Sequence, residues 1–281
     1  MPFCLTNINI RNAYFCFMKL VSIAAFLFLF LASCGNNDTK SGETSDAGPQ
    51  TPVLSYTVVA TYPHDTSSYT EGLQFVNGQL FESTGNYGFS KLLQTNLMTG
   101  QPEKQVALDP KFFGEGITVL HDTIYQMTYK EKVVFLYDLK TFKKIKELPL
   151  NIEGWGLTND GKNLIATDGS SNLYYFEPGT FRLLRTQGVT EAGTPVFNLN
   201  ELEYIDGYLY ANQYEYNYIY KIDPASGQVV AKLDLSDLVN RVRSKDPQIN
   251  VLNGIAYDST TKKIYVTGKW WPELYEIRFD H

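Results

Sequence analysis

The chain has 281 residues, of which 43% are hydrophobic and 14% aromatic, so it carries enough apolar side chains for a folded domain and is not an intrinsically disordered protein. Acidic residues outnumber basic ones by 30 to 24 and no basic run occurs, which argues against a nucleic-acid partner. The only cysteines are Cys4, Cys16 and Cys34. The body that follows them therefore has no disulfide framework and no cysteine nucleophile.

The N-terminal part has the pattern of a lipoprotein leader. From Leu20 to Ala32 the chain is apolar, and this run of 13 residues is too short to span a bilayer. It ends in Leu31-Ala32-Ser33-Cys34, which resembles a bacterial lipobox with Cys34 as the lipidation site. We predict a lipoprotein signal peptide over residues 1–34, with translation starting at Met18.

Residues 35–52 are rich in Gly, Asn, Ser, Thr, Asp and Pro, which predicts a flexible tether. The expected location is the cell envelope, with a lipid anchor in the membrane and a folded head in the periplasm or at the cell surface. Gly35 stands where an Asp often signals inner-membrane retention, so the outer membrane is favoured.

A short segment recurs five times between residues 53 and 281. Its copies start at positions 71, 115, 155, 200 and 253, which are 44, 40, 45 and 53 residues apart. This is the scale of a four-stranded propeller blade, and Asn-Gly or Asp-Gly hairpin turns follow several copies. The spacing predicts an all-β, five-bladed propeller. A β-sandwich is the alternative, but it does not explain the period.

The ends of the repeat region indicate how the ring closes. The last copy stops after its third strand, at 274–279, and an unassigned strand at 54–60 precedes the first copy. Pairing this N-terminal strand into the last blade would complete that blade and remove exposed sheet edges. One helix is expected at 235–243, between blades four and five.

The repeated segment begins the innermost strand of each blade, so its first residues should meet at one mouth of the central channel. They are Glu71, Glu115, Trp155, Asn200, Glu201 and Asn253. Crowded carboxylates there can raise one pKa and supply a neutral acid, or they can bind a cation such as calcium. Lys269, followed by two Trp, suits either a structural cation–π pair or an oxyanion stabiliser. The histidines show no metal-ligand spacing, so no metal site is assigned.

Several motifs carry a family resemblance. They include Tyr69-Thr70-Glu71-Gly72-Leu73, Phe113-Gly114-Glu115-Gly116, Glu153-Gly154-Trp155-Gly156-Leu157, Leu199-Asn200-Glu201-Leu202-Glu203-Tyr204, Val251-Leu252-Asn253-Gly254 and Thr267-Gly268-Lys269-Trp270-Trp271-Pro272. In this order, across residues 54–279, the chain resembles the plant and bacterial glutamine cyclotransferase family. The resemblance implies a five-bladed propeller, in agreement with the repeat count. It also implies an acyltransferase of the aminoacyl type, in which the α-amine of an N-terminal glutamine attacks its own carboxamide and releases ammonia.

The resemblance also implies roles for individual residues. Glu115 would be the general acid/base, Asn200 and Lys269 would hydrogen-bond the substrate carbonyl, and Trp155 would pack against the substrate. Two positions depart from the family: Glu71 stands where Gln is common, and Tyr214 stands where plant enzymes have Trp. Both are assigned to substrate binding, together with Glu201 and Asn253. No cofactor is required, although a structural calcium in the channel is left open.

The expected partners are peptides or proteins with N-terminal Gln, and a monomer is expected. Two other functions fit parts of the pattern: a non-catalytic propeller lipoprotein that binds a protein or glycan at the channel mouth, and a calcium-dependent hydrolase such as a lactonase. The joint presence of Glu115, Trp155, Asn200 and Lys269 favours the enzyme over a binding module. A lactonase should show more Asp, Asn and His in the channel.

Overall fold

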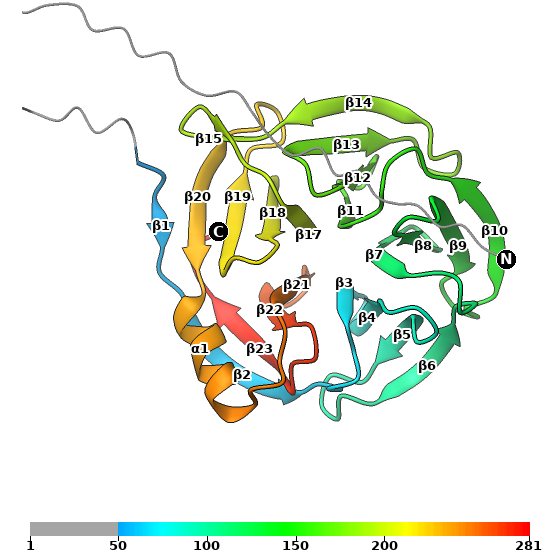
Figure 1. Cartoon of the computed structure of the whole chain (residues 1–281), viewed down its shortest axis with the longest axis horizontal. Helices are drawn as coiled ribbons and strands as arrows, with labels where there is room; N and C mark the ends of the chain where they lie inside the picture. The colour runs from blue at the N-terminus through cyan, green and yellow to red at the C-terminus, as the bar shows by residue number, and fades with distance from the viewer. Residues whose placement is uncertain (1–49) are drawn as a thin grey trace, which may run out of the picture. The chain divides into compact units, whose positions relative to one another are not determined.

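Five antiparallel sheets surround a central axis in the computed structural model, which describes residues 50–281 (Figure 1). The predicted all-β, five-bladed propeller is confirmed. The predicted signal peptide with Met18 and Cys34, and the tether up to residue 49, lie outside the described residues, so the lipid anchor and the location stay predictions.

The strands of each blade run outward from the axis in chain order. Blade one holds β3 (Thr70–Val76), β4 (Gln79–Thr84), β5 (Lys91–Thr95) and β6 (Pro102–Ala107). Blade two holds β7 (Gly114–Leu120), β8 (Thr123–Thr128), β9 (Val133–Asp138) and β10 (Lys144–Pro149). Blade three holds β11 (Leu157–Asn159), β12 (Leu164–Ala166), β13 (Asn172–Phe176) and β14 (Leu183–Gly188). Blade four holds β17 (Leu199–Ile205), β18 (Tyr208–Gln213), β19 (Tyr218–Ile222) and β20 (Val229–Asp234). Blade five holds β21 (Leu252–Asp258), β22 (Lys263–Gly268) and β23 (Glu273–Arg278).

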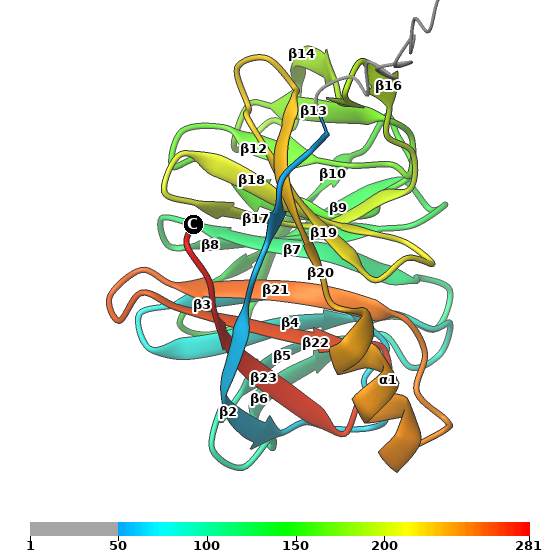
Figure 2. The ribbon, with the colours of Figure 1, turned by 90° about the vertical axis from the view of Figure 1, so that its left-hand side faces the viewer.

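The N-terminal segment closes the ring, as predicted, but with different bounds. Strand β2 (Thr57–Pro63) pairs antiparallel with β23 and forms the outer edge of blade five. The preceding β1 (Val53–Leu54) belongs instead to blade four, where it pairs parallel with β20 (Figure 2). The predicted single strand at 54–60 is therefore wrong in its limits. By bridging two neighbouring blades, the segment covers the outer edge of both.

The connection between blades four and five contains the expected helix. Helix α1 spans Ser236–Lys245, and its buried side chains Leu238, Val239 and Val242 pack into the core shared by these two blades. No helix within residues 50–281 is long and apolar enough to cross a membrane. A short hairpin of β15 (Thr190–Glu191) and β16 (Thr194–Pro195), which the sequence did not predict, connects blades three and four.

Candidate active site

A cavity of about 150 Å³ opens where the innermost strands begin. It is lined by Tyr69, Glu71, Phe113, Glu115, Tyr129, Trp155, Asn200, Tyr214 and Lys269. Six of these were predicted site residues, contributed by all five blades or the connections between them. The sequence repeat therefore locates the cavity correctly.

The backbone explains why the repeated segment faces the channel. In the innermost strands of blades one, two, four and five, the pairing register shifts at this segment: between Thr70 and Gly72, Gly114 and Ile117, Leu199 and Leu202, and Leu252 and Ile255. Such bulges bend a strand and redirect side chains, and they are frequent next to active sites. In these four blades the repeat thus bends the strand where a polar residue turns out of the ladder.

Glycine in the repeat lets neighbouring blades approach each other closely. A Cβ atom on Gly116 would lie 2.4 Å from the Leu157 nitrogen, and one on Gly156 would lie 2.0 Å from the Asn200 carbonyl oxygen. Both distances are far below van der Waals contact, so a side chain there would push two blades apart. The small diameter of the site depends on these glycines.

A buried ion pair forms one side of the cavity. The Lys269 ammonium nitrogen lies 2.6 Å from Oε1 and 2.7 Å from Oε2 of Glu71, and both side chains are less than 5% exposed. The same ammonium lies 4.4 Å from the ring centre of Tyr69 and 5.4 Å from that of Tyr214. The cation–π contact suggested with the following tryptophans is therefore wrong, because the ammonium contacts two tyrosine rings instead.

Two polar atoms in the wall lack partners. The indole nitrogen of Trp155 and the side-chain oxygen of Asn200 are buried and form no hydrogen bond with other described residues. Buried polar groups are normally satisfied, so an unpaired donor and acceptor in one cavity indicate a ligand with matching groups. An amide, with one acceptor oxygen and an N–H donor, has both.

Comparison with known proteins identifies the family. The family model for glutamine cyclotransferase matches residues 27–279. The chain belongs to the glutamine cyclotransferase family. It is 36% identical over 271 residues to the glutaminyl-peptide cyclotransferase of Arabidopsis thaliana, covering 95% of this chain and 84% of that protein. The crystal structure of Myxococcus xanthus glutaminyl cyclase superposes with a TM-score of 0.77 at 35% identity, covering 82% of this chain and 98% of that one.

In this cyclotransferase, two buried carboxyl groups, Glu71 and Glu115, line the same small cavity. Burial raises the pKa of both, although Lys269 opposes this at Glu71. Burial, and then the charge of Glu71, raise the pKa of Glu115 well above its ordinary value, although Lys269 opposes this. Because Lys269 contacts both oxygens of Glu71, the carboxylate charge stays on Glu71 and the proton on Glu115.

The lysine also stays charged. Burial lowers the pKa of Lys269, but the charge of the Glu71 carboxylate, which the ammonium contacts directly, outweighs burial and raises it. The site therefore combines an ammonium, a carboxylate and a neutral carboxylic acid within one small cavity. That combination suits proton transfer beside a group on which negative charge develops.

Two predicted substrate-binding residues lie outside the cavity lining, because their side chains bond to neighbouring blades. The fully buried carboxylate of Glu201 accepts hydrogen bonds from the Leu73 nitrogen (3.1 Å) and the Ile255 nitrogen (2.8 Å), joining blades one, four and five. The side-chain nitrogen of Asn253 donates to the Thr70 carbonyl at 2.9 Å and lies 3.4 Å from Glu71 Oε2. Both side chains therefore hold neighbouring blades together beside the site and do not line the cavity.

Three lining residues were not predicted: Tyr69, Phe113 and Tyr129. Tyr69 and Phe113 each stand two positions before the carboxylate of their own blade, so the repeat contained a signal for them. Tyr129 follows the end of β8, and nothing in the sequence distinguishes it from the many other tyrosines.

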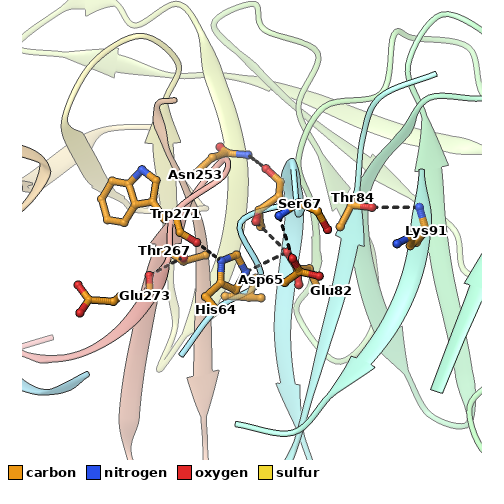
Figure 3. Close-up of polar contacts among 12 residues, drawn as sticks. His64, Asp65, Ser67, Glu82, Thr84, Lys91, Asn253, Thr267, Trp271 and Glu273 are labelled. Atoms are coloured by element: carbon orange, nitrogen blue, oxygen red, sulfur yellow. Dashed lines mark hydrogen bonds and ion pairs between the residues drawn. The ribbon is translucent and has the colours of Figure 1, made fainter. Parts of the chain in front are cut away.

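A second buried ion pair joins His64 to Glu82 (Figure 3). His64 Nε2 lies 3.2 Å from Glu82 Oε1, and Nδ1 lies 2.8 Å from the Trp271 carbonyl oxygen. The Thr70 hydroxyl donates to the same Glu82 oxygen at 2.7 Å. Since both ring nitrogens face acceptors, the imidazolium form satisfies both contacts. This pair joins the loop that carries Lys269 to the strand that carries Glu71.

Within residues 50–281, no group of three or more His, Cys, Asp or Glu side chains is arranged to hold a metal ion. The open alternative of a channel calcium, like the expected absence of a cofactor, stays a prediction.

Proposed function

We propose that this chain converts the N-terminal glutamine of peptides and proteins to pyroglutamate, with Glu115 as the proton-transfer group. The observation that carries the proposal is the pair of unpartnered polar atoms, Trp155 Nε1 and Asn200 Oδ1, in a small cavity that also contains Glu115. A glutamine carboxamide offers an acceptor and a donor to these two atoms. Membership of the cyclotransferase family and the activities of the two relatives support the same reaction.

The reaction is an internal acyl transfer. The α-amine nitrogen forms a bond to the side-chain carbonyl carbon, the bond from that carbon to the amide nitrogen breaks, and ammonia leaves. In the proposed mechanism, the fraction of Glu115 that is ionised takes the proton from the attacking amine, and the acid so formed donates it to the departing nitrogen. A pKa raised above the ordinary carboxyl value makes Glu115 a better base, and its acid form remains available near neutral pH.

Charge and shape supply the remainder of the catalysis. The carbonyl oxygen becomes negatively charged in the tetrahedral intermediate, and the Lys269 ammonium and the Trp155 N–H are the donors near which it would develop. Because the nucleophile and the electrophile belong to one residue, the cavity mainly has to hold that residue in a ring-like conformation. Trp155 and Tyr214, whose ring centres are 5.6 Å apart, form an aromatic wall suited to this task.

The direct test uses the soluble head, residues 53–281, and a peptide with N-terminal Gln. We expect ammonia release with the corresponding loss of mass, unchanged by EDTA, and no reaction with the same peptide carrying N-terminal Asn. A folded head that turns over none of several Gln peptides would contradict the proposal and favour a binding module. Turnover abolished by EDTA and restored by calcium would contradict the metal-independent mechanism.

The Glu71→Gln variant tests how the pKa of Glu115 is set. The charge of Glu71 raises the pKa of Glu115, and the same carboxylate forms the ion pair with Lys269. Removing the charge lowers the Glu115 pKa directly and leaves Lys269 facing Glu115 alone, which lowers it further. The acidic limb of the profile of kcat/KM against pH should therefore move to lower pH. A limb that stays in place or moves to higher pH would show that another group controls it.

Gly169→Ala tests the position of Trp155 without changing a lining residue. A Cβ on Gly169 would lie 2.6 Å from the Trp155 ring, and its φ of +79° is already unfavourable for other residues. We expect kcat/KM for a Gln peptide to fall by roughly tenfold or more, since small displacements in an active site are costly. Gly161→Ala is the matched control, because Gly161 has a similar φ of +83° and nothing within 4 Å. Equal losses in both variants would mean that backbone strain alone explains the effect.

A further inference from the structure

A second cavity, of about 300 Å³, lies over blade one. Its lining includes Asp65, Ser67, Asn86, Phe89, Lys91 and Trp270. Figure 3 shows Asp65 and Ser67 close to the His64–Glu82 pair, and Lys91 farther to the right, next to Thr84. We call this space the blade-one cavity; the reaction proposed above does not use it.

The blade-one cavity and the active-site cavity share a wall. Tyr69 lines the active-site cavity, Trp270 lines the blade-one cavity, and their ring centres are 4.9 Å apart. The Gly85 nitrogen donates to the Tyr69 carbonyl at 2.8 Å, and a Cβ on Gly85 would lie 3.1 Å from the Glu71 side chain. The residues on either side of Gly85, Thr84 and Asn86, line the blade-one cavity. Only one layer of residues therefore separates the two spaces.

The wall and the rim each carry an aromatic ring. Trp270 has a φ of +62°, which is uncommon for a bulky side chain. Its backbone nitrogen donates to the Ser68 carbonyl at 2.8 Å, which anchors this residue in the wall. Phe89 on the rim is 74% exposed, so its ring has apolar surface left to bury against a ligand.

The size of the active-site cavity requires the rest of a peptide to lie elsewhere. Its volume of about 150 Å³ lies below the usual range of roughly 300–1,000 Å³ for ligand pockets, so it suits one residue of a peptide rather than several. The residues that follow must leave across the rim, and the adjoining rings of Tyr69 and Trp270 place the blade-one cavity next to the active-site cavity.

We propose that the blade-one cavity is the subsite for the residue that follows the N-terminal glutamine, and that Phe89 and Trp270 make it prefer an aromatic or long apolar side chain. This inference rests on the proposed function. Phe89 would lose its exposed apolar surface when such a side chain packs on it, which favours binding. The subsite thus makes a peptide a better substrate than free glutamine amide.

Three substrates and three proteins test the subsite. The soluble head, its Phe89→Ala variant and its Phe197→Ala variant are each assayed on glutamine amide, Gln-Gly amide and Gln-Phe amide. Phe197 is the matched control, because it is also an exposed aromatic (57%) but lines a different cavity, between blades three and four. We expect the unmodified head to prefer Gln-Phe over Gln-Gly in kcat/KM by roughly three- to tenfold. Phe89→Ala should remove this preference through KM and leave glutamine amide unchanged, and Phe197→Ala should change nothing.

The outcomes separate the subsite from the reaction. Two outcomes would overturn the subsite alone. In the first, the unmodified head turns over all three substrates without a preference; in the second, Phe89→Ala leaves the preference intact. A preference lost in Phe197→Ala instead would place the second residue between blades three and four and overturn the assignment to blade one. No turnover of any substrate by the folded head would overturn the proposed function and the subsite with it.

Discussion

Replacing Glu115 by Gln should lower kcat for a Gln peptide by roughly 10²- to 10⁴-fold, the usual contribution of a positioned general acid or base. The amide keeps the size of the side chain, but it cannot take up the proton of the attacking amine. KM should change little, because the Trp155 and Asn200 groups that face the substrate are untouched. The measurement is steady-state ammonia release at saturating peptide, with circular dichroism to establish that the variant is folded.

Glu203→Gln is the matched control for this experiment. Glu203 is also a buried glutamate on an innermost strand, and burial raises its pKa to about 8, although hydrogen bonds from Tyr257 and Thr158 oppose this. Its carboxyl bonds to the Tyr257 nitrogen at 3.0 Å rather than facing the cavity. We expect this variant to retain full kcat. If Glu115→Gln remained active within threefold while Glu71→Gln lost activity, Glu71 would be the proton-transfer group.

The sequence repeat predicts the blades and the position of the site for a physical reason. Neighbouring blades approach so closely at the channel that a small residue is needed there, so pairs such as Glu71-Gly72 and Glu115-Gly116 recur at the blade period. The N-terminal closure could also be predicted, since an incomplete last blade needs a strand. The limits of the N-terminal strand could not be predicted. The few residues of β1 pair with a different blade through backbone bonds, and these leave no pattern in the side chains.

The sequence repeat does not predict which of its side chains face the cavity. Asn200 and Glu201 are neighbours in one motif, yet Asn200 faces the cavity and Glu201 spans to two other blades. In blade five, Asn253 occupies the repeat position, but Lys269 from the end of β22 takes the place at the cavity. These choices depend on which backbone N–H groups of neighbouring blades need an acceptor, and only the assembled ring shows that.

Removing His64 should destabilise the head more than any other change considered. In His64→Ala the Glu82 carboxylate remains buried without its partner, and breaking a buried ion pair in this way costs roughly 3–5 kcal/mol of unfolding free energy. The loop from Lys269 to Pro272 also loses its contact through the Trp271 carbonyl, so kcat should fall even where the variant is folded. Urea unfolding gives the first quantity and ammonia release the second. A loss of less than 1 kcal/mol would mean that the pair contributes little.

The pH dependence of stability identifies the charged form of the pair. Burial lowers the pKa of His64, but the charge and hydrogen bond of Glu82, together with the Trp271 carbonyl, outweigh burial and raise it above the ordinary value. The stabilisation is therefore complete below the unfolded-state pKa of about 6.5 and is lost as the pH rises through the higher folded-state value. The double variant His64→Gln/Glu82→Gln has no titrating group there and provides the reference. The advantage of the unmodified head in unfolding free energy should be constant at acidic pH and should decline above neutrality. An advantage that grew with pH would show that a neutral histidine, rather than an imidazolium, joins blade one to the Lys269 loop.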